Sequence, residues 1–141
     1  MTGADLAAAA QALVGTPFRL HGRCRRIGLD CVGLVGASLE ACGRQPHYPQ
    51  GYRLRNAAIA RWMEFAGLNG LILAAGPILC GDIVLTRPGP GQHHLLVALG
   101  HDRFLHAHAG LRKVVAQHLV IDTPPLARWR AFPDAEQTWQ H

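Results

Sequence analysis

The sequence predicts a single α+β domain, in which N-terminal helices pack on a C-terminal antiparallel sheet of about five strands. Two observations lead to this fold class. Helix-forming segments occupy the first half of the chain, and short apolar runs separated by turns follow Pro77. With 141 residues, of which 49% are hydrophobic and 16% are charged, residues 1–141 fit one domain with a sizeable core.

Three helices are expected, over residues 4–14, 31–42 and 56–66. The first is rich in alanine, which has the highest helix propensity, and Pro17 follows its end. The second stops at Gly43, because glycine readily adopts the conformation that terminates helices. Asn56 is a suitable N-cap for the third. The glycine- and arginine-rich segment 18–30 is expected to be a loop.

Five strands are expected in the second half, over residues 82–86, 94–99, 103–108, 113–118 and 127–132. The segments between them are rich in glycine and proline, which favour turns. Because the connections are short, the strands are expected to follow one another as an antiparallel meander on which the helices pack.

Composition and charge exclude several classes of function. The formal net charge is +5, but the basic residues are scattered apart from Arg23, Arg25 and Arg26, and no nucleic-acid-binding motif accompanies them. We therefore expect no nucleic-acid partner. No apolar stretch reaches the roughly 18 residues of a membrane span, and residues 1–6 lack the positive charge of a signal peptide. Synthesis in the cytoplasm is therefore expected.

Four cysteines are present, namely Cys24, Cys31, Cys42 and Cys80. No two of them form a CxxC pair, so a structural zinc site is not expected, and a cytoplasmic chain keeps its thiols free. Cys31 differs from the others because a polar, glycine-rich segment becomes an apolar helix at this residue. The free N–H groups and the positive dipole end of a helix start favour the thiolate that a nucleophilic cysteine needs.

Two histidines later in the chain complete the pattern of a cysteine-based active site. His94 and His106 lie in apolar runs that are expected to be neighbouring strands. An imidazolium at His94 would stabilise the Cys31 thiolate and later protonate the leaving amine. His106 would hold the second nitrogen of that ring and fix its orientation. The backbone N–H of Cys31 is a natural donor to an oxyanion.

The abundance of histidine leaves alternatives open. His93 competes with His94, although strand alternation directs the two side chains to opposite faces. His108 shares a face with His106, and periodicity does not choose between them. A zinc site is a further alternative, with ligands from His93, His94, His106, His108 and His118. No HExxH motif supports it, so we expect neither a metal nor another cofactor.

Four segments resemble, in order and spacing, motifs of the NlpC-type family of papain-like cell-wall cysteine peptidases, the NlpC/p-sixty superfamily. Leu13–Arg19 resembles the family's G-x-P-Y motif, and Gly28–Val35 resembles its G-x-D-C-S-G-L-V nucleophile motif. Cys80–Leu85 resembles P-G-D-L-V, and His94–Ala107 resembles H-V-G-I-Y-L-G followed by F-I-H-A. Each motif is short, but the four together reach across most of the chain.

The resemblance implies a papain-like α+β fold and a catalytic triad. Cys31 would be the nucleophile, His94 the base and His106 the orienting residue, in preference to His93 and His108. The reaction would be the hydrolysis of peptidoglycan stem peptides, typically at the amide between D-γ-glutamyl and a diamino acid. A peptidoglycan peptide is therefore the expected substrate.

The resemblance also marks three residues as substrate contacts. Asp30 is retained from the nucleophile motif and would meet a substrate amine. Val32 stands where the family usually has serine, and Phe18 where it usually has tyrosine. Both replacements remove a hydroxyl from the neighbourhood of the nucleophile, so they affect recognition of the substrate more than the triad.

The Cys31-Val32 pair, the lone domain, the missing signal peptide and Trp129–Pro133 resemble a subgroup found in phage tails and gene transfer agents. Such a peptidase would have tail proteins as partners and would act extracellularly or in the periplasm after delivery on the particle. Two other functions stay open. One is a structural tail-assembly protein with little or no catalysis, and the other is an amidase or acyltransferase that uses the same triad.

Overall fold

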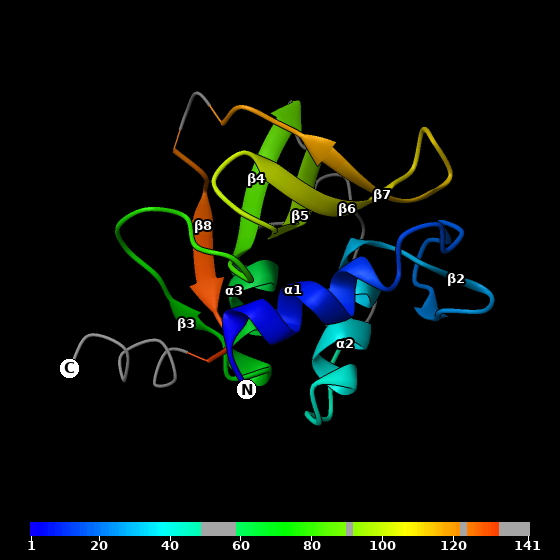
Figure 1. Ribbon diagram of the computed structural model, residues 1–141, viewed down its shortest axis with the longest axis horizontal. Coiled ribbons are helices and arrows are strands. Elements are labelled where there is room, and N and C mark those ends of the chain that lie inside the picture. Colours follow the sequence, from blue (N-terminus) through cyan, green and yellow to red (C-terminus); the bar gives the residue numbers. More distant parts are fainter. Residues whose placement is uncertain (49–58, 90–91, 122–123, 133–141) are drawn as a thin grey trace.

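A computed structural model describes residues 1–48, 59–89, 92–121 and 124–132. Three helices gather on one side of an antiparallel sheet, which confirms the predicted α+β class (Figure 1). Within these ranges, no helix combines the length and the apolar character that crossing a membrane requires.

The three expected helices are α1 (Gly3–Gln11), α2 (Cys31–Ala41) and α3 (Ile59–Leu68). A capping box begins α1, since Thr2 Oγ1 accepts a hydrogen bond from the Asp5 N–H and the Asp5 carboxylate accepts one from the Thr2 N–H. Asn56, the expected cap of the third helix, lies outside the described residues.

The described residues contain eight strands. Two short strands, β1 (Arg23–Cys24) and β2 (Gly28–Leu29), form a hairpin inside the segment that was expected to be a loop. The large sheet contains β3 (Ile72–Leu73), β4 (Ile83–Gly89), β5 (Gln92–Ala98), β6 (Arg103–His108), β7 (Lys113–His118) and β8 (Ala127–Arg130). All five expected strands are present. The sixth, β3, is too short to produce a recognisable pattern.

The strand order corrects the expected meander. Strands β4 to β7 do follow one another, but β8 pairs with β4 instead of β7, and β3 pairs with β8. A buried ionic cluster holds this arrangement. Asp82, directly before β4, has its carboxylate oxygens 2.6 Å from Arg128 Nη1 and 2.8 Å from Arg130 Nε, and both arginines belong to β8.

The two faces of the sheet bury different sets of side chains. Leu95 and Val97 of β5 belong to the main core with the helices, whereas Leu96 and Ala98 belong to a smaller cluster. This alternation follows from the pleat of the strand, which directs successive side chains to opposite faces. The same alternation separates two histidines of β5, because His93 shares a face with Leu95 and contacts Trp62 of α3 (Ile59–Leu68), whereas His94 shares a face with Leu96.

Candidate active site

Cys31 is the first residue of α2, and Asp30 is the N-cap of that helix. Asp30 Oδ1 accepts a hydrogen bond from the Gly33 N–H at 2.8 Å and so satisfies one free donor of the first turn. Cys31 is fully buried, and the backbone of Leu95 is hydrogen-bonded to its thiol. Leu95 directly follows His94, so the thiol lies against the strand that carries the expected base.

Asp30 is engaged in structural contacts. Its Oδ2 accepts a hydrogen bond from the His21 N–H at 2.8 Å, and its Oδ1 lies 3.1 Å from Arg23 Nη1. The Arg23 guanidinium also lies over the Tyr48 ring, 4.3 Å from the ring centroid. These contacts tie the β1–β2 hairpin to the start of α2. The Asp30 carboxylate is fully buried. The expected contact between Asp30 and a substrate amine stays a prediction.

Gly33 allows α2 and the segment before β1 to approach closely. A Cβ at position 33 would lie 2.1 Å from the carbonyl oxygen of Gly22, which is closer than any side chain tolerates. Close packing of the start of α2 against the Gly22 carbonyl therefore requires a glycine two residues after Cys31.

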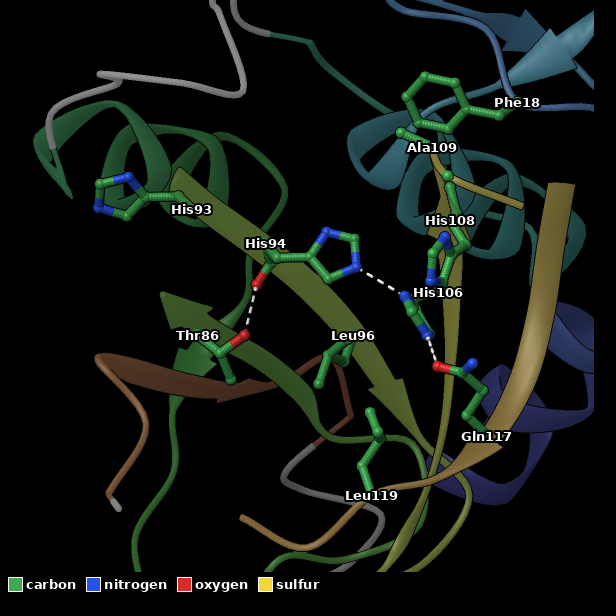
Figure 2. Close-up of a pocket in the computed structure, with 12 residues that line it drawn as sticks. Phe18, Thr86, His93, His94, Leu96, His106, His108, Ala109, Gln117 and Leu119 are labelled. Atoms are coloured by element: carbon green, nitrogen blue, oxygen red, sulfur yellow. Dashed lines mark hydrogen bonds between the residues drawn. The ribbon is translucent and has the colours of Figure 1, made fainter. Parts of the chain in front are cut away.

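A chain of hydrogen bonds joins side chains from three adjacent strands. His94 Nε2 of β5 lies 2.7 Å from His106 Nδ1 of β6, and the two rings meet nearly perpendicularly. His106 Nε2 lies 2.6 Å from Gln117 Oε1 of β7. Figure 2 shows the two imidazoles and the amide in this order, each directed at the next. The sequence-predicted pair, His94 and His106, is thus brought into direct contact.

Burial controls the charge of both groups that would react. Burial, and then the charge of Asp30, raise the pKa of the Cys31 thiol to about 12. Burial, followed by His106 and His108, lowers the pKa of His94 to about 4. Burial therefore disfavours both charged forms of the expected thiolate–imidazolium pair, which stays a prediction.

A cavity of about 310 Å³ lies beside the histidine chain (Figure 2). Its wall combines the imidazoles with small or apolar side chains, including Phe18, Thr86, Leu96, Ala107, Ala109 and Leu119. Of the three residues expected to contact substrate, Phe18 faces this cavity, while Val32 is fully buried in the main core.

The competing histidines have other contacts. The His93 ring stacks on Trp62 of α3, with 6.0 Å between centroids, and Figure 2 shows it directed away from His106. The His108 ring lies 5.2 Å from that of His106, but its Nδ1 accepts a hydrogen bond from the Leu111 N–H. The geometry therefore places His106 against His94, and His108 beside the pair.

The zinc alternative finds no support in the described ranges. There, no three side chains of histidine, cysteine, aspartate or glutamate are arranged to hold a metal ion. His118 lies apart from the cavity, with its Nε2 3.0 Å from Asp102 Oδ2 at the exposed end of β7.

Comparison with known proteins gives matches among solved structures. No protein-family model matches the sequence, and no curated protein matches it either. The NlpC/p60 domain of the peptidoglycan hydrolase SagA is 25% identical with a TM-score of 0.62, and the match covers 92% of this chain and 98% of that one. NlpC2 from Trichomonas vaginalis is 18% identical with a TM-score of 0.66, covering 92% and 47%.

A third match is an NlpC/p60 family protein from Bacillus cereus, 17% identical with a TM-score of 0.60, covering 94% of this chain and 41% of that one. The chain has the NlpC/p60 fold. It spans nearly the whole SagA domain but less than half the length of the Trichomonas and Bacillus chains. The predicted papain-like architecture is thereby confirmed.

Within this NlpC/p60 fold, Gln117 is the residue of the site that sequence reasoning missed. Its position in β7, directly before His118, follows no motif, and a glutamine in a strand carries no chemical signal of its own. The predicted ranges of β6 and β7 already implied that residues 106 and 117 lie near each other, so strand register was the one clue available.

Proposed function

We propose that this protein is a cysteine peptidase that hydrolyses amide bonds in peptidoglycan stem peptides, between D-γ-glutamyl and a diamino acid. The observation that carries the proposal is the contact of His94 Nε2 with His106 Nδ1 at 2.7 Å. His94 is in β5, and the backbone of Leu95, the next residue of that strand, is hydrogen-bonded to the Cys31 thiol. The NlpC/p60 fold, which the peptidoglycan hydrolase SagA shares, supports the substrate class.

In the proposed reaction, His94 acts first as a general base. It accepts the proton of the Cys31 thiol as sulfur attacks the carbonyl carbon of the amide. The carbonyl oxygen becomes an oxyanion, which the backbone N–H of Cys31 at the helix start would stabilise. The imidazolium of His94 then protonates the leaving amine, and the C–N bond breaks to leave a thioester.

Water completes the cycle. His94 takes a proton from the water as it attacks the thioester, and the thiol leaves with that proton to restore the resting site. Because burial disfavours the charged form of both groups, we expect charge to develop when a substrate carbonyl is present to share it. Proton transfer and attack on the carbonyl therefore belong to one step.

The cavity beside His94 and His106 is the proposed binding site for the scissile peptide. Phe18 contributes an apolar ring to its wall, in the place of a family tyrosine. Val32 is a residue of α2 whose side chain is buried in the main core, so it helps to pack this helix. We propose that substrate contacts come from Phe18 and the imidazoles, while recognition by Asp30 would require Arg23 to give up its ion pair.

The test is cleavage of purified sacculi by wild type and by Cys31→Ala, with released fragments identified by mass spectrometry. We expect wild type to produce new amino termini on the diamino acid and Cys31→Ala to produce none, while Cys24→Ala, which removes an exposed thiol, retains activity. Full activity of Cys31→Ala would refute the mechanism. A cut at another amide or an ester would instead indicate the amidase or acyltransferase alternative.

We also propose delivery on a phage-like tail, with tail proteins as partners and action outside the cytoplasm. The proposal rests on the Cys31-Val32 variant of the nucleophile motif and on the Trp129-containing C-terminal segment. Mass spectrometry of purified particles should find the chain in stoichiometric amounts. Its presence in the cell extract but not in particles would overturn this part. Particles that contain an inactive chain would favour the structural tail-assembly role.

A further inference from the structure

Gln117 reaches the histidine pair from a strand that the proposed triad does not use. It lies in β7 opposite Phe104, whereas His106 lies opposite Val115 in the same pair of strands. Gln117 and His106 are therefore diagonal neighbours on one face, within reach of each other's side chains. Gln117 Oε1 lies 2.6 Å from His106 Nε2, and Gln117 also lines the cavity.

The chemistry of this contact determines which nitrogen carries each proton. An amide oxygen only accepts hydrogen bonds, so His106 Nε2 must carry the proton that it donates to Gln117. In a neutral ring His106 Nδ1 is then an acceptor, and His94 Nε2, 2.7 Å away, must be the donor to it. His94 Nδ1 is left with a free lone pair, which is the form that a general base requires.

We propose that Gln117 is a positioning residue that, through His106, sets the tautomer of His94 so that Nδ1 is the basic nitrogen. The inference rests on the proposed role of His94 as the base. His108 does not compete for this function, because its Nδ1 accepts the Leu111 N–H at 3.0 Å. Cys31 and the water of the second step would both lose their protons to the nitrogen that Gln117 selects.

The opposite amide orientation gives the opposite result. If the Gln117 NH₂ group faced His106, it would donate to Nε2, and His106 Nδ1–H would then donate to His94 Nε2. His94 would carry its proton on Nδ1 and could not accept one there. His94 can therefore act as a base through Nδ1 only if residue 117 accepts a hydrogen bond from His106. Replacement of Gln117 by a residue that cannot accept this hydrogen bond is the direct test.

Imidazole ¹⁵N spectra of the 15.3 kDa chain report the tautomers without any substrate. In wild type we expect Nε2–H on both His94 and His106. Gln117→Met removes donor and acceptor at similar length and should give a mixture, while Gln117→Lys, a donor only, should shift His94 towards Nδ1–H. Gln11→Met, at an exposed position of α1, should leave the spectra unchanged. Nδ1–H on His94 in wild type, or unchanged tautomers in Gln117→Met, would overturn the proposal.

Kinetics on a stem peptide form the second arm. Gln117→Met should lower kcat about tenfold with little change in KM, because the general base acts in the chemical step, and Gln117→Lys should lower it further. If Gln117→Lys does not fold, Gln117→Met and the wild-type spectra decide the question. If wild type cleaves no peptide, the proposed function fails but the spectra still test the tautomers. A KM effect with unchanged kcat would assign Gln117 to substrate binding instead.

Discussion

His94 Nε2 lies 2.7 Å from His106 Nδ1, and this contact leaves the other ring nitrogen of His94 outside the hydrogen bond between the two histidines. The two histidines come from neighbouring strands whose register places Val97 opposite Leu105. The contact therefore depends on strand pairing, and it orients His94 without any charged partner. A neutral pair suits a cavity in which burial already lowers the pKa of both rings.

Removal of His106 should reduce catalysis more than binding. We expect His106→Ala to lower kcat on the order of a hundredfold, since a correctly placed general base supplies roughly 10²–10⁴-fold. KM should change little, because the orientation of His94 matters in the chemical step. His118→Ala, at an exposed residue outside the cavity, is the matched control. Equal kcat for His106→Ala and wild type would remove His106 from the site.

The thiols should differ in reactivity in an order that the sequence does not suggest. Cys24 is exposed, and hydrogen bonds from the backbone of Arg26 and Ile27 lower its pKa. Burial raises the pKa of Cys31 to about 12. In the free protein at pH 7, iodoacetamide should therefore modify Cys24 well before Cys31.

Mass spectrometry of tryptic peptides over time measures this order directly. In strong denaturant the difference between the two cysteines should largely disappear, which serves as the control. Fast modification of Cys31 at pH 6 in the native protein would contradict a neutral resting thiol and would instead indicate a preformed thiolate.

The stability of the fold should depend on pH through His94. Its pKa is about 4 in the folded protein, against 6.5 for an ordinary histidine. Below pH 6.5 the unfolded chain binds a proton at this residue that the folded protein does not bind until about pH 4. The free energy of unfolding should therefore fall by about 3 kcal/mol as the pH decreases from 6.5 to 4, and then level off.

Urea unfolding at several pH values, compared between wild type and His94→Gln, isolates this contribution. The variant has no titrating ring at position 94, so its stability should fall less over the same pH range. Identical pH dependence in the two proteins would show that the His94 ring is not held in its neutral form.

The close approach at Gly33 should make this position intolerant of a side chain. Gly33→Ala would place a methyl group 2.1 Å from the Gly22 carbonyl oxygen, and we expect a loss of about 2 kcal/mol or more in the free energy of unfolding. Gly67→Ala is the matched control. It lies in α3 with no atom within 4 Å of the added Cβ, so it should stabilise the helix by up to about 1 kcal/mol. Similar urea midpoints for the two variants would contradict this packing.

Much of the fold could be predicted because its signals are local. Cys31 begins a helix since Asp30 is a good cap and an apolar segment follows. The predicted ranges 103–108 and 113–118 coincide with β6 and β7. The separation of His93 from His94 follows from the two-residue period of a strand. These features depend on residues a few positions apart, and short-range spacing is readable in one sequence.

The sequence by itself thus determined the helix that presents Cys31, the strands that carry His94 and His106, and the α+β class. The tertiary structure alone decided the insertion of β8 beside β4, which depends on Asp82 meeting Arg128 and Arg130 more than forty residues later. It also decided the burial that raises the pKa of the Cys31 thiol and lowers the pKa of His94, and the contact of Gln117 with His106. Burial and the pairing of β4 with β8 arise only when distant segments pack together, so no local pattern records them.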